Sequence, residues 1–471
     1  MTGDLTSFPL SPLDGRYRTT VAPLANHLSE AALNRARITV MVEWVIFLTE
    51  RELVPGAPKL AAQQIADLRK VAALSAADVA ALAEIERVTV HDVKACEYFI
   101  VERLAGALQD SALAERVTPL VHFACTSEDV NNLAYALTIR AAITDIWLPA
   151  AQGLIGDLAD LAQENAAVPM LARTHGQAAT PTTLGKELAV FAHRLRRQAR
   201  RVSATEFLGK FNGATGTYGA HVVAAPGVDW PAAAKDFVTS FGLTWNPLTT
   251  QIESHDWQAE LFADVARFNR IAHNLATDMW TYISLGYFQQ VRGQGTVGSS
   301  TMPHKVNPIR FENAEANLEI SCALLDSLAA TLVTSRLQRD LTDSTTQRNI
   351  GVGLGHSLLA LDNLRRGLAG LAVDHAALEA DLAANWEVLA EPIQSVMRAA
   401  GAAGEPGMGE PYERLKDLTR GQQVDAETIT EFIAGLGLPD EAAERLRALS
   451  PSSYTGLAEQ LVRTYLSLDD S

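Results

Sequence analysis

The stretch that decides the fold is AELFADVARFNRIAHNLATDMWTYISL, residues 259–285. Apolar side chains recur in it at spacings of three and four, the period of an α-helix with one apolar face. They are Leu261, Val265, Phe268, Ile271 and Leu275. The stretch lies in a run of 38 residues, 248–285, without glycine or proline. A helix over the whole run would be about 57 Å long, so we expect an elongated bundle of long helices.

Three further segments have helical patterns. Residues 309–350 form a second run of 42 residues without glycine or proline. We expect another helix from Ser127 to about Trp147, because hydroxyls at the cap and acids in the first turn favour a helix N-terminus. A fourth helix is expected after Thr180, with Pro181 at its first position. Strand patterns with Asn-Gly or Asp-Gly turns are few, so the sequence predicts an all-α fold.

The helical pattern is interrupted near residue 112 and again near residue 368. We therefore expect an N-terminal helical domain over 1–112, a central bundle of long helices over 113–368 and a C-terminal helical domain over 369–471. A glycine-rich loop, 293–308, separates the two longest runs. This loop is expected at an end of the bundle.

Composition excludes several classes of protein. The 471 residues are 48% hydrophobic, which is enough to bury a large core. The 39 Lys and Arg against 55 Asp and Glu give a net charge of −16, which argues against a nucleic-acid partner. An anionic ligand must then be bound by a local cluster of cations. The three cysteines are too few and too scattered for a disulfide scaffold and indicate a reducing compartment.

Targeting and metal-binding patterns are also missing from the sequence. The first residues lack a basic start followed by an apolar run, and no apolar stretch reaches about 18 residues. We therefore expect a soluble cytoplasmic protein with no membrane partner. Neither HExxH nor CxxC occurs, so we expect no metal site and no cofactor.

The loop 293–308 reads GQGTVGSSTMPHKVNP. Its glycines allow backbone N–H groups to converge on an anion. The hydroxyls of Ser299 and Ser300, with Lys305 and Asn307, complete a set suited to a carboxylate. Because binding residues are often placed on loops held by rigid elements, we predict that this loop is functional.

Residues 298–308, GSSTMPHKVNP, resemble the signature loop of the fumarase/aspartase superfamily, whose members eliminate fumarate from a succinyl-bearing substrate. His304 before the lysine resembles the adenylosuccinate lyase family, although the related cycloisomerases can also carry histidine there. Six further segments resemble that family in order, while Val90 stands where close relatives carry asparagine. The segments are DGRY (14–17), HDVK (91–94), HFACTSED (122–129), RTHGQ (173–177), SRLQRDLTDS (335–344) and NWEVLAEPIQ (385–394).

The resemblance implies a fumarase/aspartase-like all-α fold and β-elimination of fumarate from a succinyl-purine nucleotide, a step of purine biosynthesis. It implies a homotetramer with active sites shared between chains. His175 matches the general acid and Ser299 the general base. Glu312 matches the acidic partner of His175, and Lys305 is expected to stabilise the alkoxide of the serine. On chemistry alone, Ser300 could serve as the base equally well.

Other matched positions are expected to hold the substrate. At the start of a helix, Thr126 and Ser127 offer hydroxyls, amides and the positive end of a dipole to a carboxylate. The remaining binding residues implied by the resemblance are Arg16, Tyr17, His91, Asp92, Gln251, Ser300, Asn307, Arg339, Ser344 and Arg348. Histidines outside the motifs, including His255, are interpreted as structural or surface residues.

Two alternatives remain open on the sequence. One is another lyase of the superfamily, such as an argininosuccinate lyase, or a cycloisomerase. The other is a non-catalytic helical protein, since lyases of this superfamily have been recruited as lens proteins. The segments 14–17 and 339–344 suit a nucleotide better than a free amino acid, which favours the adenylosuccinate lyase family.

Overall fold

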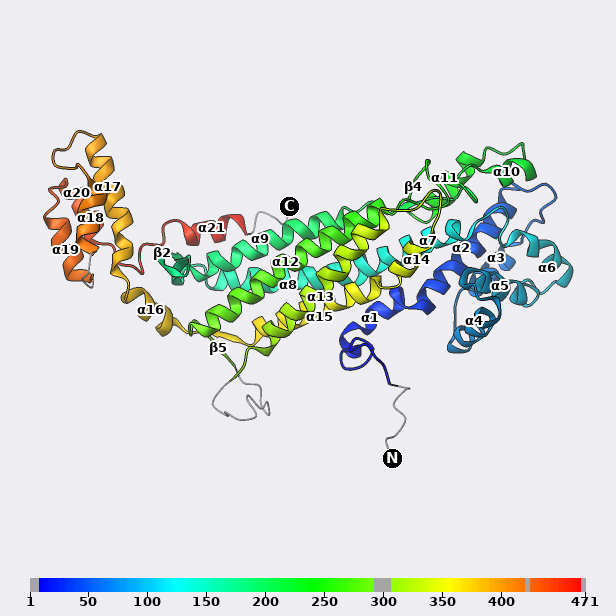
Figure 1. Ribbon diagram of the computed structural model, residues 1–471, viewed down its shortest axis with the longest axis horizontal. Helices are drawn as coiled ribbons and strands as arrows, with labels where there is room; N and C mark the ends of the chain where they lie inside the picture. The colour runs from blue at the N-terminus through cyan, green and yellow to red at the C-terminus, as the bar shows by residue number, and fades with distance from the viewer. Residues whose placement is uncertain (1–7, 292–305, 420–423, 467–471) are drawn as a thin grey trace, which may run out of the picture. The chain divides into compact units, whose positions relative to one another are not determined.

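The computed structural model describes residues 8–291, 306–419 and 424–466 (Figure 1). Helices dominate it, and the prediction of an all-α fold is confirmed. Within these ranges the strands form three two-stranded pairs. They are β1 (Pro169–Thr174) with β2 (Gln177–Thr183), β3 (Leu208–Gly209) with β4 (Thr244–Trp245), and β5 (Phe288–Gln290) with β6 (Leu371–Val373). No helix in the described ranges has the length and apolar character needed to cross a bilayer.

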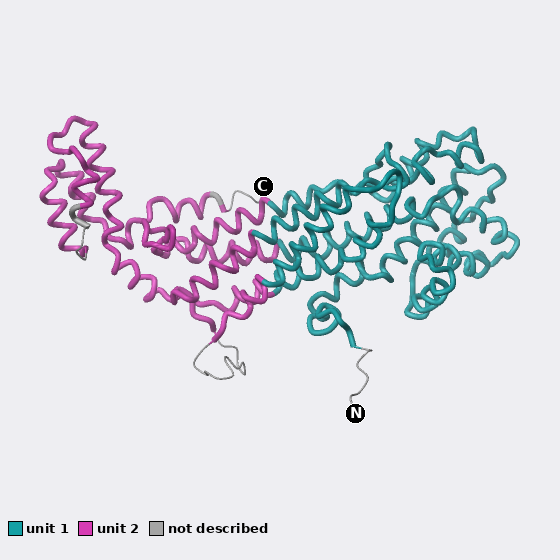
Figure 2. Tube along the Cα trace, viewed as in Figure 1, with its two compact units in different colours: residues 1–151, 198–270, 316–362 teal, residues 152–197, 271–315, 363–471 magenta. Residues whose placement is uncertain are grey.

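The chain separates into two compact units (Figure 2). Unit 1 comprises residues 1–151, 198–270 and 316–362, and unit 2 comprises residues 152–197, 271–315 and 363–471. Five long helices contribute residues to both units. They are α8 (Leu148–Glu164), α9 (Leu184–Ser203), α12 (Asp256–Ser284), α13 (Ile309–Leu332) and α15 (Ile350–Ala369). The division into three domains with boundaries after 112 and 368 stays a prediction.

Unit 1 is built around α2 (Glu30–Glu50) and an aromatic core. The ring of Trp44 in α2 lies 4.3 Å from that of Phe211 and 4.9 Å from that of Phe237, measured between centroids. These rings are almost fully buried, so α2 is packed against the segment that follows α9. The helices that lie wholly in this unit are α1 (Arg18–Leu28), α2 (Glu30–Glu50), α3 (Ala62–Lys70), α4 (Ala76–Thr89), α5 (Asp92–Leu108), α6 (Ser111–Val117), α7 (Ser127–Ala142), α10 (Gly219–Ala224), α11 (Trp230–Ser240) and α14 (Thr342–Gln347).

Unit 2 holds the β1–β2 hairpin and the C-terminal helices. These helices enclose an apolar cluster of their own, which includes Ile393, Met397, Ile429 and Leu446. The helices that lie wholly in this unit are α16 (His375–Ala383), α17 (Ala390–Ala402), α18 (Pro411–Thr419), α19 (Ala426–Ala434), α20 (Asp440–Arg447) and α21 (Ala458–Tyr465).

The long glycine- and proline-free runs are not single helices, so the expected 38-residue helix is wrong. Helix α12 has 29 residues, about 44 Å at 1.5 Å per residue, and begins at residue 256. The run 309–350 is interrupted after α13. There the Asp340 carboxylate accepts hydrogen bonds from the backbone N–H groups of Arg336 and Thr342, each at 2.8 Å. A side-chain acceptor of this kind offers the backbone a non-helical partner, which ends the helix without glycine or proline.

Two other helix boundaries differ from the expectation. Pro181 is not at the start of a helix, because it lies in β2 opposite Leu171. Helix α9 begins three residues later, and the Thr183 hydroxyl accepts a hydrogen bond from Lys186 N at 3.2 Å. The helix that begins at Ser127 extends beyond residue 147. A π-helical turn over residues 143–147 joins α7 directly to α8.

Helix α4 ends at Val90, whose backbone is left-handed (φ 52°, ψ 33°) and whose side chain is 87% exposed. A β-branched residue is disfavoured in this conformation by about 1–2 kcal/mol. Asparagine tolerates this conformation far better. The next residue, His91, begins α5 by accepting a hydrogen bond from Lys94 N at its Nδ1 atom. Local strain is therefore stored directly before a predicted site residue.

We predict that Val90→Gly and Val90→Asn each raise the free energy of unfolding by about 1 kcal/mol, because both remove this strain. The measurement is the urea unfolding midpoint at a fixed protein concentration. The matched control is Val88→Gly in the same helix, where the side chain is 74% exposed. This control should lower stability by up to about 1 kcal/mol. Equal losses in Val90→Gly and Val88→Gly would contradict the assignment of strain to Val90.

Candidate active site

Unit 1 contains a cavity of about 470 Å³. Its wall is formed by the starts of α5 and α7, the loop before α12, and the segment from residue 339 to 348. These segments lie far apart in the sequence. The cavity brings together eight of the predicted site residues: His91, Asp92, Thr126, Ser127, Gln251, Arg339, Ser344 and Arg348.

The N-terminus of α7 forms one side of the cavity. Thr126 is the N-cap residue, and Ser127 is the first residue of the helix. Both line the cavity, where the free backbone N–H groups of the first turn and the positive end of the helix dipole favour an anion. This arrangement is chemically suited to a carboxylate.

The first turn of α7 is fastened by a buried carboxylate. Asp129 accepts hydrogen bonds from Thr126 N at 2.8 Å, Asn212 N at 2.9 Å and Gly213 N at 3.1 Å. It also forms an ion pair with Lys210 Nζ at 2.8 Å, and both side chains are 0% exposed. Sequence reasoning missed Lys210, which lies in no motif and carries no local signal of its partner.

Three arginines supply the positive charge of the cavity: Arg37, Arg339 and Arg348. Arg37 is 2% exposed, and its NH2 atom lies 2.8 Å from Asp92 Oδ2. Sequence reasoning also missed Arg37. The signal that could have found it is an arginine within the apolar stretch of α2, since a buried arginine requires an acidic partner.

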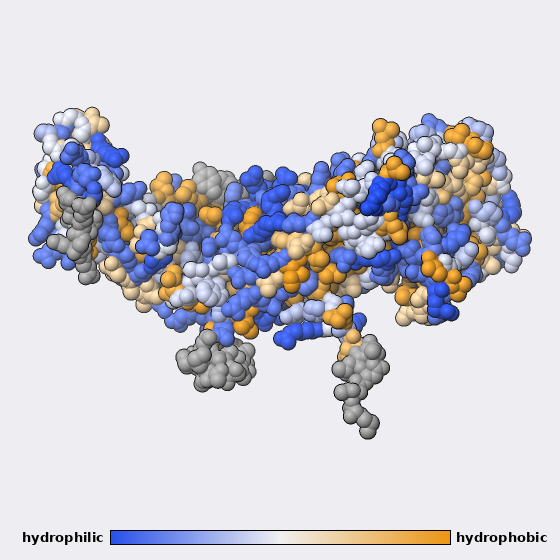
Figure 3. Space-filling view, in the orientation of Figure 1, coloured by the Kyte–Doolittle hydropathy of each residue, from blue (hydrophilic) through white to orange (hydrophobic). Residues whose placement is uncertain are grey.

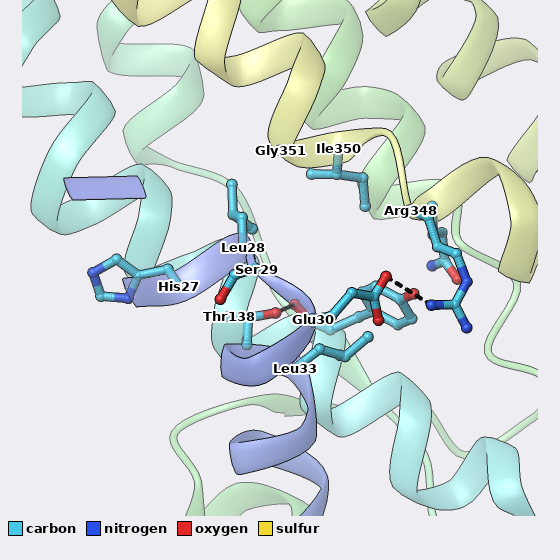
Figure 4. A pocket seen from close by; sticks show the side chains of 11 residues that line it. His27, Leu28, Ser29, Glu30, Leu33, Thr138, Arg348, Ile350 and Gly351 are labelled. Carbon is cyan, nitrogen blue, oxygen red and sulfur yellow. Dashed lines mark hydrogen bonds and ion pairs between the residues drawn. The ribbon is translucent and has the colours of Figure 1, made fainter. Parts of the chain in front are cut away.

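The Arg348 guanidinium connects two elements. Its NH2 atom lies 2.9 Å from Asp92 Oδ2, and its NH1 atom lies 2.7 Å from Glu30 Oε1. Figure 4 shows the contact with Glu30 beside a small hollow of about 30 Å³, which holds roughly one water molecule. Asp92 therefore lies between two guanidinium groups.

This position determines the ionisation of Asp92. Burial by itself would raise the pKa of the carboxyl group, but the charges of Arg37 and Arg348 and a hydrogen bond from Val93 N outweigh burial. The pKa of Asp92 therefore lies below its ordinary value. The carboxylate stays ionised at neutral pH and keeps both arginines in place.

Arg16 and Tyr17 do not line the large cavity. Tyr17 is the N-cap residue of α1, and the Arg16 guanidinium lies 5.8 Å from the centre of its ring. Asp14 of the same motif lines a neighbouring hollow of about 190 Å³, which Arg348 also borders. The motif is thus near Arg348 without contributing to the wall of the cavity itself.

His175 belongs to unit 2 and forms the tip of the β1–β2 hairpin. The two loop residues, His175 and Gly176, have positive φ values of 52° and 75°, as in the tight turns that match the twist of a hairpin. Arg173 NH2 in β1 donates to Asp381 of α16 at 2.6 Å, and Tyr287 also hydrogen-bonds that carboxylate. The hairpin that carries His175 is therefore anchored to α16.

Glu312 lies in the first turn of α13, and its carboxylate accepts a hydrogen bond from Trp280 Nε1 at 3.2 Å. Within residues 8–291, 306–419 and 424–466, no hydrogen bond or ion pair joins Glu312 to His175. Asn307 lies two residues before α13. Ser299, Ser300 and Lys305 lie outside the described residues.

The described part of the chain contains no group of three or more His, Cys, Asp and Glu side chains arranged to hold a metal ion. The three cysteines are unpaired with one another. Burial raises the pKa of the Cys125 thiol well above its ordinary value, which keeps this neighbour of Thr126 unreactive. The polar groups on the cavity wall are cations, carboxylates, hydroxyls, amides and the imidazole of His91.

Comparison with known proteins identifies the family. Residues 15–320 match the lyase family, and residues 335–455 match the adenylosuccinate lyase C-terminal family. The chain is 49% identical to an adenylosuccinate lyase of Escherichia coli K12, with 96% of this chain and 97% of that protein covered. It is 47% identical to the adenylosuccinate lyase of Haemophilus influenzae over the same shares. This chain belongs to the adenylosuccinate lyase family.

Solved structures agree on the fold. The 3-carboxy-cis,cis-muconate lactonizing enzyme of Pseudomonas putida is 20% identical, with a TM-score of 0.73 and 95% of this chain covered. A fumarate lyase of Mesorhizobium sp. BNC1 gives the same TM-score at 19% identity, with 94% of this chain covered. Both likenesses concern the fold alone. The resemblance to the adenylosuccinate lyase family inferred from the motifs is confirmed.

The buried ion pair below α7 gives a prediction about stability. Lys210→Met should lower the free energy of unfolding by about 3–5 kcal/mol, because it leaves the Asp129 carboxylate buried without its counter-charge. Chemical denaturation at a fixed protein concentration measures the loss.

The control is Lys70→Met, which removes a lysine paired with Asp67 on the surface, where Lys70 is 71% exposed. An exposed pair of this kind contributes about 0–1 kcal/mol. Equal effects of the two substitutions would show that the Asp129–Lys210 pair does not support unit 1.

Proposed function

We propose that this chain is an adenylosuccinate lyase of purine biosynthesis that works in the cytoplasm. It would cleave adenylosuccinate to AMP and fumarate, and succinylaminoimidazole carboxamide ribotide to the carboxamide ribotide and fumarate. The observation that carries the proposal is the cavity of unit 1. There, residues from three separate family motifs line one wall that combines three arginines with a helix N-terminus.

The reaction is a β-elimination. A base removes the proton from the carbon beside one carboxylate of the succinyl group. The electrons form the double bond of fumarate, and the C–N bond breaks. The leaving nitrogen takes a proton from an acid, and positive charge stabilises the intermediate. In our proposal Ser299 is the base and His175 is the acid, with Glu312 orienting His175. This scheme requires no cofactor.

A serine base needs help, because a free hydroxyl barely ionises at neutral pH. Lys305 and the N–H groups of the glycine-rich loop would stabilise the alkoxide, with Asn307 binding a succinyl oxygen. Ser300 is the chemical alternative to Ser299, and the family pattern favours Ser299.

The cavity of unit 1 would hold the rest of the substrate. Thr126 and Ser127 suit a succinyl carboxylate, since both lie at the start of α7. Arg339 and Arg348 suit the phosphate of the nucleotide. Their guanidinium groups are already oriented by Asp343 and Asp92, which lowers the cost of ordering them when the ligand binds.

We also propose a homotetramer in which each active site draws residues from three chains. The family resemblance implies this assembly, and the exposed apolar side chains of the long helices support it. Val190 in α9 is 39% exposed, Trp280 in α12 is 42% exposed and Ile320 in α13 is 45% exposed. Figure 3 shows apolar surface interspersed with hydrophilic surface on one face of the molecule.

The direct test follows the loss of succinyl-purine absorbance when purified protein is mixed with adenylosuccinate. We expect turnover by the wild type and losses of roughly 10²–10⁴-fold or more in His175→Ala and Ser299→Ala, because each removes a proton-transfer group. Circular dichroism should show unchanged folding. The control His375→Ala, an exposed histidine at the start of α16, should keep full activity.

Three outcomes would revise the proposal. Near-normal turnover in Ser299→Ala with loss in Ser300→Ala would move the base by one residue. Activity in both serine variants would place the base elsewhere. Turnover of argininosuccinate or a carboxymuconate, but not of adenylosuccinate, would favour a different lyase or a cycloisomerase.

Subunit complementation tests the shared site. Mixing inactive His175→Ala and Ser299→Ala chains, under conditions that allow exchange, should restore activity to about one quarter of wild type at most. Random mixing gives a site with two donor chains about a one-in-four chance of receiving both intact groups. No recovery despite proven exchange would place His175 and Ser299 in the same chain.

A further inference from the structure

A chain of buried polar side chains lies behind Arg339 in unit 1. It runs from Gln347 through Gln258 and His255 to Asp343. The exposed fractions are 3%, 1%, 1% and 7% in that order. None of these four residues lines the large cavity, but Asp343, the last of them, accepts a hydrogen bond from Arg339, which does. Of the two interpretations of His255, structural or surface, only the structural one agrees with its burial and its hydrogen bonds.

The hydrogen bonds that link these four side chains run in one consistent direction. Gln347 Nε2 donates to Gln258 Oε1 at 3.1 Å, so the amide nitrogen of Gln258 faces His255 Nδ1 at 3.3 Å. That nitrogen can only donate, which makes Nδ1 the acceptor and leaves the ring hydrogen on Nε2. His255 Nε2 therefore donates to Asp343 Oδ2, at 3.1 Å.

Asp343 in turn holds two residues of the cavity wall. Arg339 NH1 lies 2.7 Å from both of its oxygens, and Ser344 N donates to Oδ1 at 2.6 Å. Burial would raise the pKa of Asp343, but the hydrogen bond from His255 and the charge of Arg339 outweigh it and lower the pKa. Asp343 thus stays ionised and keeps Arg339 in one orientation.

Ser344 is oriented as a donor by the same contacts. Arg339 NH2 donates to Ser344 Oγ at 3.1 Å and to Glu128 Oε1 at 3.1 Å. Because the Ser344 oxygen already accepts from a guanidinium, its own O–H is left to donate into the cavity that it lines. Ser344 can therefore donate to an acceptor on a ligand, such as a phosphate or carboxylate oxygen.

The backbone of His255 is unusual as well. Its φ is +61°, a left-handed conformation that residues with side chains rarely adopt. Its carbonyl oxygen accepts from Gln258 N and Ala259 N, so His255 heads α12, and its own N–H donates to Glu253 Oε2. Glycine would fit this position without strain. Strain that persists at a buried, fully bonded side chain points to a role for that side chain.

We propose that His255 is a positioning residue for the substrate site. Its Nε2–H holds the Asp343 carboxylate in the orientation that presents Arg339 and Ser344 to the nucleotide part of the substrate. This inference deepens the proposed function and rests on it. His255 itself contacts neither the cavity nor the reacting atoms.

The test compares two substitutions at one position. His255→Phe keeps a ring of similar size but removes both hydrogen bonds, so KM for adenylosuccinate should rise roughly tenfold or more. Because substrate and transition state lose the same contact, kcat should change by less than about threefold. In His255→Gln the side-chain amide can place a donor near the former Nε2, which should restore KM to within about threefold of wild type.

Two further variants separate positioning from stability. His356→Phe removes another buried histidine of unit 1, whose Nδ1 atom lies 2.8 Å from Asn317 Oδ1 away from the cavity. It should lower the melting temperature without changing KM. Gln258→Met leaves the His255 ring in place but removes the donor to Nδ1, and should raise KM roughly threefold. If His255→Phe fails to fold, an unchanged KM in Gln258→Met overturns the proposal.

The outcomes for the two proposals are distinct. A wild-type protein that does not cleave adenylosuccinate refutes the proposed function. A crystal structure of His255→Phe then decides the positioning claim, since we expect the Asp343–Arg339 contact to be lost or rotated. An active wild type with unchanged KM in His255→Phe, or the same Asp343–Arg339 geometry in that crystal, overturns it.

Discussion

The architecture of the cavity depends on one buried charge, the Asp129 carboxylate in the first turn of α7. A carboxylate that is 0% exposed must be compensated, and Lys210 with the backbone N–H groups of Asn212, Gly213 and Thr126 supplies the compensation. The requirement fixes the start of α7 against the segment that follows α9. The amides and hydroxyls of the first turn are then held in place before any ligand arrives, as a carboxylate-binding site requires.

Paired charges also hold the other charged side chains of the cavity wall in place. In a chain with a net charge of −16, an anion-binding site needs cations that are concentrated and fixed. Each arginine of the cavity is held by at least one carboxylate, and Asp92 serves two of them, Arg37 and Arg348. Behind Arg339, the support continues through Asp343 to His255. The cavity therefore presents guanidinium groups whose orientations are set by the carboxylates paired with them.

Sequence patterns predicted the helical fold and eight residues of the cavity wall, because both rest on local signals: an apolar period of three to four, and short motifs. They predicted the start of α7 at Ser127, but not the end of α13 or the start of α12, which are set by contacts such as the Asp340 turn and the left-handed His255. Nor did they find Arg37 and Lys210, whose partners lie far away in the sequence. Support of this kind is a property of the folded chain, and no single stretch encodes it.

The central claim is that the cavity of unit 1 binds the succinyl nucleotide. The most direct measurement is a crystal structure of the protein with AMP and fumarate bound. We expect the phosphate within hydrogen-bonding distance of Arg339 or Arg348, and a fumarate carboxylate at the N-terminus of α7 beside Thr126 and Ser127. A structure with both ligands bound elsewhere, and this cavity filled only with water, would contradict the account.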